Sequence, residues 1–177
     1  MDGTLFLALA LRCAPQVDAG TVQALVAVES GFNPYAIGVV GGVLIRQPRT
    51  KPEAVTTAKA LQTEGWNFSV GLAQINLRNL EPLGLTVESA FDPCTSLTAM
   101  QTVLADCYDR ASAKNANTAA RSQAVLRQAL SCYYSGNFVT GFAHGYVHRV
   151  ALAARPPRSP EASFRSLSPL VIAKETP

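Results

Sequence analysis

The chain lacks the motifs of several large enzyme classes. Its 177 residues contain no Ser in a Gly-x-Ser-x-Gly turn, no P-loop, no Gly-x-Gly-x-x-Gly fingerprint and no His-Glu-x-x-His motif. Each of these motifs places a nucleophile, a phosphate-binding loop or metal ligands at a fixed spacing. Serine hydrolases with a Gly-x-Ser-x-Gly nucleophile turn, nucleotide-binding enzymes with a P-loop or a Gly-x-Gly-x-x-Gly fingerprint, and zinc peptidases with a His-Glu-x-x-His motif are therefore excluded.

Charge and long apolar runs are also scarce. Charged residues make up 15% of the chain and the formal net charge is +3. No run reaches the roughly 18 to 20 apolar residues of a membrane-spanning helix. A charge this small and scattered suits an anionic polymer but does not indicate a nucleic-acid partner. With 48% hydrophobic residues, we expect one globular domain with a substantial core, no transmembrane segment and no nucleic-acid ligand.

The two ends of the chain differ from its middle. Residues 5–11 are apolar but short, without a basic segment before them or a clear cleavage site after them. We interpret them as the first helix, with a truncated export signal as the alternative. Residues 155–177 are rich in Pro, Ser and Arg, which is typical of a flexible tail. The expected organisation is one domain over residues 1–154 and a tail over residues 155–177.

Cysteine and histidine are few. The four cysteines form no Cys-x-x-Cys pair, so they allow two disulfides, connected in any of three ways, or four buried thiols. Pairing of Cys94 with Cys107 is the least expected, because one helix would hold them about 20 Å apart. His144 and His148 are one helical turn apart, but no third ligand lies nearby. We therefore expect no metal ion and no other cofactor.

One acidic residue is distinguished by its position. In residues 21–31, apolar residues precede Glu29 by three, four and seven positions, so Glu29 lies on the stripe that an amphipathic helix turns toward its core. No basic residue lies one turn away to pair with it. Because burial disfavours the charged form, we expect a raised pKa for Glu29, as in a general acid. Gly31 can end the helix, which would put Glu29 beside a surface cleft. The alternative is a boundary residue bonded only to local backbone.

The remaining pattern is mostly helical. Apolar periodicity and stop signals predict further helices over residues 52–64, 77–84, 96–113, 118–133 and 141–154. Residues 37–45 alternate β-forming residues around Gly41 and Gly42, which predicts a β-hairpin beside the cleft, with a plain glycine loop as the alternative. The single tryptophan, Trp66, suits either a sugar-binding surface or the core. The expected fold class is mostly α, with a small β-hairpin.

A single desolvated acid limits the possible chemistry. Glycosidases normally use two carboxylates, and no obvious second one accompanies Glu29. One carboxyl suffices when the substrate supplies its own nucleophile, because the acid that protonates the leaving oxygen can then deprotonate an internal hydroxyl.

Four motifs occur in an order that is typical of one enzyme family. They are Glu29-Ser30-Gly31-Phe32-Asn33-Pro34, Gly71-Leu72-Ala73-Gln74-Ile75-Asn76, Asp92-Pro93-Cys94 and Cys132-Tyr133-Tyr134-Ser135-Gly136. With this order and spacing, residues 10–153 resemble the soluble lytic transglycosylases. The segments at residues 46–51 and 67–71 resemble the branch that serves type IV secretion and conjugation machines.

The resemblance implies a lysozyme-like, α+β fold and a definite reaction. Such enzymes cleave the β-1,4 bond between N-acetylmuramic acid and N-acetylglucosamine in peptidoglycan without water, leaving an anhydro-muramic end. Glu29 would be the catalytic acid and then the base, and Tyr133 would help orient it. The substrate-binding residues implied are Ser30, Gln74, Asn76, Tyr133 and Tyr134. Two positions depart from the family's pattern: Gly38 replaces a common serine, and Tyr134 replaces an asparagine, so the resemblance does not carry over the serine contact or the amide contact.

The resemblance also implies partners and a compartment. Peptidoglycan strands and type IV secretion or conjugation components are the expected partners, in a periplasmic location where thiols oxidise and two disulfides are expected. Two alternatives stay open. One is a hydrolytic, goose-type-like lysozyme with a second acid near Glu64 or Asp92, and the other is an assembly protein that binds glycan without cutting it.

Overall fold

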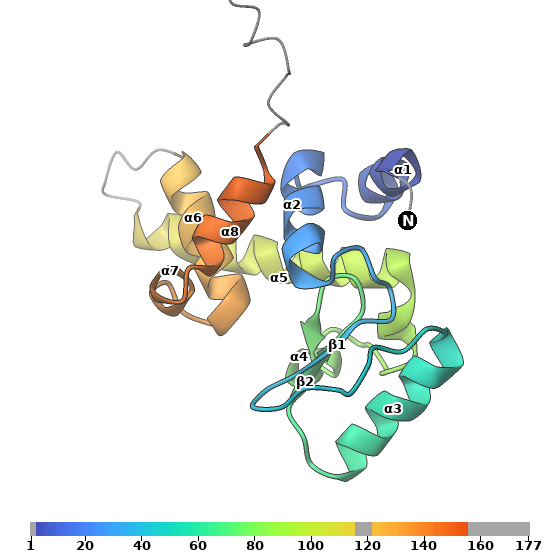
Figure 1. Cartoon of the computed structure of the whole chain (residues 1–177). Helices are drawn as coiled ribbons and strands as arrows, with labels where there is room; N and C mark the ends of the chain where they lie inside the picture. Colours follow the sequence, from blue (N-terminus) through green and yellow to red (C-terminus); the bar gives the residue numbers. More distant parts are fainter. Residues whose placement is uncertain (1–2, 116–121, 156–177) are drawn as a thin grey trace, which may run out of the picture.

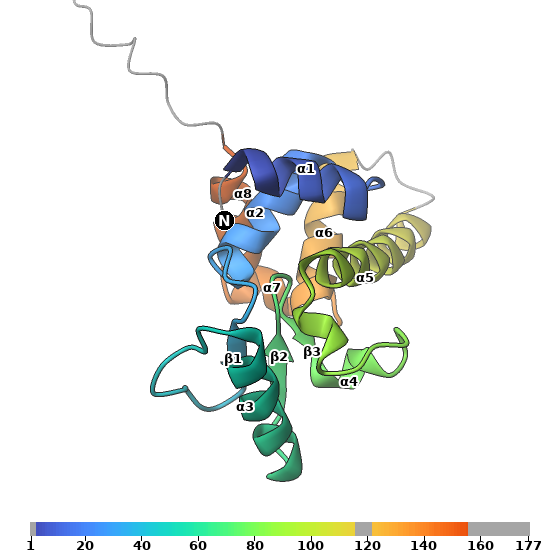
Figure 2. The same cartoon turned by 90° about the vertical axis from the view of Figure 1, so that its right-hand side faces the viewer.

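The computed structural model describes residues 3–115 and 122–155, in which α5 (Pro93–Lys114) is the longest helix. In both views (Figures 1 and 2), the sheet, α3 and α4 lie below the group formed by α1, α2, α6 and α8. The helices of the upper group are α1 (Gly3–Cys13), α2 (Ala19–Glu29), α6 (Ser122–Ser135) and α8 (Tyr146–Ala153). The short helix α7 (Thr140–Ala143) lies between α6 and α8 in the chain. The lower group consists of β1 (Ile37–Val39), α3 (Lys51–Thr63), β2 (Phe68–Val70), β3 (Ile75–Asn76) and α4 (Leu77–Leu80), followed by the 3-10 helix η1 (Ser89–Phe91). The predicted class, mostly α with a small antiparallel β element, is confirmed.

Local signals explain where the main helices begin and end. Asp18 accepts a hydrogen bond from the Thr21 amide at the start of α2, and Asp92 accepts one from the Thr95 amide at the start of α5. Such side-chain caps satisfy amide groups that have no partner within the helix. Gly31 follows α2 with φ +57°, a left-handed conformation that glycine adopts without strain. The prediction that Gly31 ends this helix and leaves Glu29 on the last turn is confirmed, since α2 ends at Glu29.

The apolar segment at residues 5–11 forms most of α1. Phe6 and Ala10 are buried in the core, whereas Leu5 and Leu11 are exposed. Over residues 3–115 and 122–155, no helix is both long enough and apolar enough to cross a membrane.

The sheet differs from the predicted hairpin. Its three antiparallel strands are ordered β1-β2-β3, and Gly38 pairs with Ser69 while Ser69 pairs with Asn76. The prediction of a hairpin over residues 37–45 was wrong, because β1 pairs with β2 from a distant part of the chain. Residues 43–45 form no strand, and at Ile37 the free edge of β1 is bonded by the side chain of Gln47 instead.

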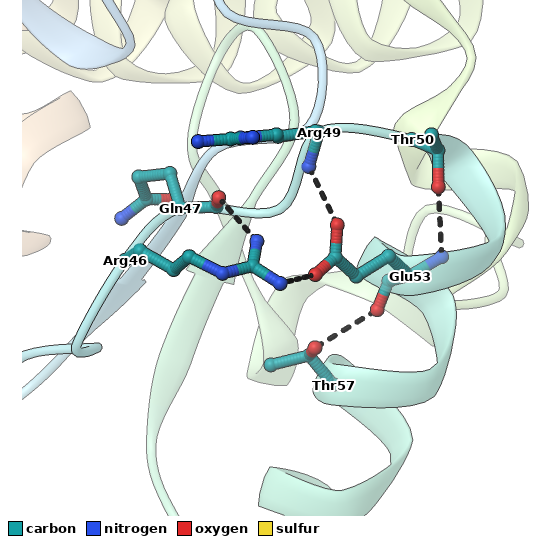
Figure 3. Close-up of polar contacts among 6 residues, drawn as sticks. All are labelled: Arg46, Gln47, Arg49, Thr50, Glu53 and Thr57. Atoms are coloured by element: carbon teal, nitrogen blue, oxygen red, sulfur yellow. Dashed lines mark hydrogen bonds and ion pairs between the residues drawn. The ribbon is translucent and has the colours of Figure 1, made fainter.

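The amide of Gln47 replaces a strand partner for β1. Its Oε1 accepts from the Ile37 N–H at 2.8 Å and its Nε2 donates to the Ile37 carbonyl at 2.9 Å. The segment that carries Gln47 is anchored to the start of α3 by Glu53, which binds the Arg46 guanidinium and accepts from the Arg49 N–H at 2.8 Å (Figure 3). The outer edge of β1 is thus bonded at Ile37 by one side chain.

Two of the predicted helices are shorter than expected. The predicted helix over residues 141–154 is divided into α7 and α8, because Gly145 takes a left-handed conformation with φ +69° between them. Residues 77–84 are helical only over α4 and then form turns up to Gly84. Residues 118–121 of another predicted helix, and the expected tail apart from Arg155, lie outside the described residues.

Two disulfides connect the helices of the core. Cys13 is bonded to Cys94, which joins α1 to the start of α5, and Cys107 is bonded to Cys132, which joins α5 to α6. The expectation of two disulfides is confirmed, and the pairing judged least favourable, Cys94 with Cys107, does not form.

Candidate active site

A cleft of about 820 Å³ lies between the helices and the sheet. It is lined by residues of α2, the three strands, α4, α5 and the end of α6. The sequence-predicted residues that line it are Glu29, Gln74, Asn76, Tyr133 and Tyr134. The structure therefore brings together residues that are up to about a hundred positions apart in the chain.

Glu29 is the last residue of α2 and lies at the cleft wall, where it is half-buried. Burial raises the pKa of Glu29 to about 7, although a hydrogen bond from Tyr146 and the positive charge of Arg149 act in the opposite direction. The predicted rise in pKa is confirmed. At neutral pH, both the protonated and the ionised form of Glu29 are therefore accessible.

Tyr146 is the side chain that contacts Glu29 directly, and sequence reasoning missed it. Its hydroxyl donates a hydrogen bond to Glu29 Oε1, and its ring is 2% exposed. Burial, and then the negative charge of Glu29, raise the pKa of Tyr146, so the phenol stays protonated and remains a donor. In the sequence Tyr146 reads as a core residue of an amphipathic helix, and no local signal connects it to a residue 117 positions away. The alternative in which Glu29 bonds only local backbone is wrong.

Tyr134 and Arg149 pack around Tyr146. The ring of Tyr134 stacks on that of Tyr146, with centroids 4.6 Å apart, and the Tyr134 hydroxyl lies 3.3 Å from His144 Nδ1. The Arg149 guanidinium lies 5.9 Å from the centroid of the Tyr146 ring and donates to the His144 carbonyl at 3.0 Å. These contacts limit the positions that the Tyr146 hydroxyl can take.

Tyr133 lies close to Glu29 but bonds elsewhere. Its hydroxyl donates to the carbonyl oxygen of Ala73 at 2.6 Å. Burial, and then the negative charge of Glu29, raise the pKa of Tyr133, so this phenol is also a neutral donor. Tyr133 therefore fixes the backbone next to Gln74 rather than holding the glutamate itself.

The side chain of Gln74 fills the space beside Gly38. Its backbone has φ +49°, and its Nε2 donates to the carbonyls of Ala36 and Gly71, both at 3.0 Å. A Cβ atom on Gly38 would come within 2.6 Å of Gln74 Oε1. At the position where the sequence resemblance leads one to expect a serine side chain, the space is therefore taken by the Gln74 amide.

Asn76 and Ser30 have hydrogen bonds within the protein. Asn76 accepts from the Arg78 N–H at 3.1 Å, which caps α4, and donates to Asn67 Oδ1 at 2.9 Å. Ser30 donates from its hydroxyl to the Val26 carbonyl at 3.3 Å and is not among the cleft-lining residues described. Their roles in binding substrate stay predictions.

The other acidic residues are arranged differently from Glu29. Among the described residues that line the cleft, the second acid is Asp106, which is exposed and forms an ion pair with Arg110 at 3.2 Å. Glu64 accepts from the Trp66 indole N–H at 3.1 Å, and Asp92 caps α5. Neither of these two is found among the cleft-lining residues, so the structure offers no support for either as a second acid.

The two histidines lie on different elements. His144 follows α7 as its C-cap, whereas His148 is within α8. No group of three or more His, Cys, Asp or Glu side chains placed to hold a metal ion was found within the described part of the chain.

Comparisons with known proteins agree with this geometry. Residues 6–150 match the family model described as the transglycosylase SLT domain. The chain belongs to the transglycosylase SLT family. It is 51% identical over 154 residues to the type IV secretion system protein virB1 of Brucella suis biovar 1 (strain 1330), covering 84% of this chain and 63% of that protein. It is 38% identical over 148 residues to protein virB1 of Agrobacterium fabrum (strain C58), covering 82% of this chain and 58% of that protein.

These matches cover only part of each relative. The chain spans about three fifths of the length of these curated relatives. The search of solved structures gave no significant match.

Proposed function

We propose that this chain is a lytic transglycosylase that cleaves the β-1,4 bond between N-acetylmuramic acid and N-acetylglucosamine in peptidoglycan. The observation that carries the proposal is Glu29, a carboxyl group with a pKa of about 7 at the wall of an open cleft. A group with this pKa at neutral pH is available both as an acid and, after proton transfer, as a base. Membership of the SLT family supports the same reaction.

In the proposed reaction, Glu29 transfers its proton to the glycosidic oxygen as the bond from that oxygen to C1 of the muramic residue breaks. The developing positive charge at C1 is then captured by the C6 hydroxyl of the same sugar, and Glu29 takes the proton of that hydroxyl. The products are an anhydro-muramic end and a free glucosamine end. Water is not consumed, and Glu29 regains its initial protonation state.

The arrangement of the cleft supports one acid rather than two. A hydrolytic enzyme that inverts or retains needs a second carboxylate as base or nucleophile. Asp106, the other acid among the described cleft-lining residues, is exposed and paired with Arg110. The internal C6 hydroxyl removes the need for such a group.

The proposed substrate contacts follow from free hydrogen-bonding capacity. Gln74 uses its N–H groups on backbone carbonyls, so its Oε1 is the atom that can accept from a sugar hydroxyl or acetamido N–H. Asn76 and Tyr134 add polar groups along the same cleft, and Tyr133 holds the backbone beside Gln74. Ser30 stabilises the turn after the acid.

The cellular setting is part of the proposal. Two relatives carry the names type IV secretion system protein virB1 and protein virB1, which supports a role in opening the cell wall for a type IV secretion or conjugation machine. Such a role places the protein in the periplasm, where the two disulfides would be stable. We propose residues 1–154 as the catalytic domain.

Mass spectrometry of the sugar ends released from purified peptidoglycan tests the proposal. The parent protein should release fragments lighter by one water than hydrolytic products. Glu29→Gln should reduce their release by about a hundredfold to ten-thousandfold, because general-acid assistance has that size. Glu81→Gln, on an exposed residue outside the cleft-lining set, is the matched control and should cut normally. Reducing ends would instead indicate a lysozyme, and the absence of any product would favour a non-cutting glycan-binding protein.

A further inference from the structure

One wall of the cleft is formed by a charged face of α5. The residues of α5 that line the cleft are Thr102, Val103, Asp106, Cys107 and Arg110. Their spacing places them on one side of the helix, with Asp106 and Arg110 a turn apart. Charged groups are thus part of the cleft itself, at positions that the proposed proton transfer does not use.

The guanidinium of Arg110 is held by three neighbours. It donates to Asp106 Oδ2 at 3.2 Å and to the carbonyl of Gly136 at 3.4 Å, and it lies 5.7 Å from the centroid of the Phe138 ring. The side chain remains 50% exposed. A guanidinium has five N–H donors in a planar fork, so donors remain after the contacts with Asp106 and Gly136. A long side chain that is already held in place loses less conformational freedom when it binds an anion.

The charged groups of an intact peptidoglycan strand belong to its peptide stems. The two sugars carry hydroxyl and acetamido groups, and the lactyl group is joined to the stem through an amide. A cation in a cleft that binds only sugars would have no charged partner on the ligand. A stem brings carboxylates, and guanidinium is the side chain best shaped to bind a carboxylate.

We propose that Arg110, oriented by Asp106 and Phe138, binds a free carboxylate of the peptide stem and makes the cleft selective for stems whose carboxylates are not amidated. This inference rests on the proposed function for its choice of substrate. Asp106 acts through Arg110 and is a positioning residue. The contact lies on α5, whereas the proposed proton transfer takes place at Glu29, on α2.

The binding test uses the full chain with Glu29→Gln, so that the ligand is not cut. Calorimetry compares a tetrasaccharide whose peptide stems have free carboxylates with the same tetrasaccharide whose stem carboxylates are carboxamides. We expect the free-acid form to bind about fivefold to tenfold more tightly, the size of one charge-assisted contact at a half-exposed site. Higher salt should reduce this ratio.

Substitutions assign the selectivity to one side chain. Adding Arg110→Ala should bring the affinity ratio close to one, whereas Arg110→Lys should keep part of it, because the charge remains and the fork is lost. Arg127→Ala, on an exposed residue of α6 outside the cleft-lining set, is the matched control and should leave the ratio unchanged. Equal affinity of the Glu29→Gln protein for both ligands, or an Arg110→Ala change that weakens both ligands equally, would overturn the inference.

Cleavage by the parent protein separates this inference from the proposed function. If the parent converts both tetrasaccharides to anhydro ends while binding shows no charge preference, the stem inference alone fails. If the charge preference is present and neither ligand is cut, the transglycosylase proposal fails and the stem site stands.

Discussion

Replacing Tyr146 with Phe should change the pH dependence of glycan cleavage as well as its rate. Burial raises the pKa of Glu29, and the Tyr146 hydroxyl, which donates to Glu29 Oε1, limits that rise, so that the pKa is about 7. A hydrogen bond to a charged group contributes about 1.5 to 3 kcal/mol, and 1.36 kcal/mol corresponds to one pKa unit. Because the neutral acid keeps part of this bond, we expect the loss of the hydroxyl to raise the pKa of Glu29 by about one unit.

The direction of the shift in the pH profile distinguishes this mechanism from a general loss of folded protein. Glu29 must be protonated to act as the acid, so activity falls as the pH rises through its pKa. In the parent, kcat/KM should be half-lost near pH 7, and in Tyr146→Phe near pH 8. The maximal rate should also fall, by about tenfold or more, because the carboxyl group is less well positioned.

Initial rates of anhydro-end release over the range from about pH 5 to pH 9.5 give both quantities, since kcat/KM reports the pKa values of the free enzyme. Tyr108→Phe is the matched control, because Tyr108 lies on α5 outside the cleft-lining residues described. A basic limb that stays at pH 7 in Tyr146→Phe, or moves to lower pH, would refute the assignment of Tyr146 as the group that lowers the pKa of Glu29.

Three further predictions follow from burial, disulfide bonding and backbone conformation. Glu29 has a higher pKa in the folded protein than the 4.5 of an exposed glutamate, so the free energy of unfolding should fall as the pH rises from about 4.5 to about 7. Glu29→Gln should abolish this fall. In urea titrations at pH 8, this variant should be more stable than the parent by up to about 3 kcal/mol. Thiol titration of the unfolded protein should find no free thiols among the four cysteines before reduction and all four after it, since both disulfides are formed. Gly65→Ala should lower the free energy of unfolding by about 1 kcal/mol, through the left-handed φ of +77° alone. Gly71→Ala should lower it by about 3 kcal/mol or more, because the new Cβ would also lie 2.4 Å from the Ala90 carbonyl oxygen. Equal losses of stability in thermal unfolding of the two variants would contradict this.

The parts of the fold that sequence predicted correctly depend on local physics. The helix that ends at Glu29 follows from apolar spacing and from Gly31, both within a few residues of the acid. The raised pKa of Glu29 follows from the same stripe, because an acid on a core-facing position must lose solvent. These features needed no knowledge of the rest of the chain.

The errors arose where distant residues decide the structure. The β-forming residues after Gly41 predicted a hairpin, yet the partner of β1 is β2, and Val43 and Ile45 are almost fully exposed. Local alternation identifies a strand but does not identify its partner. Gln47 closes the edge of β1 through its side chain, and no spacing rule predicts such a contact.

Tyr146 shows the same limit within the candidate site. Its neighbours in sequence, Val147 and Val150, are buried, so its own burial is predictable from helical periodicity. That its hydroxyl meets Glu29 depends on the packing of α8 against α2 and on the turn at Gly145 that separates α8 from α7. Because α8 begins directly after this turn, a continuous helix over residues 141–154 would have placed the tyrosine differently.

The contact between Tyr146 and Glu29 also explains how one acid can serve both proposed proton transfers. Burial raises the pKa of Glu29, and the hydrogen bond from Tyr146 and the charge of Arg149 each oppose that rise. Burial without a donor would leave an acid that is protonated at neutral pH but gives up its proton reluctantly, whereas an exposed glutamate would already be ionised. A pKa near 7 makes both protonation states accessible at neutral pH, which the proposed transfer to the glycosidic oxygen and the return of the C6 proton both require. The same balance implies that Tyr146 and Arg149 matter to the reaction without touching the substrate, and that their loss should move the pH profile in the same direction.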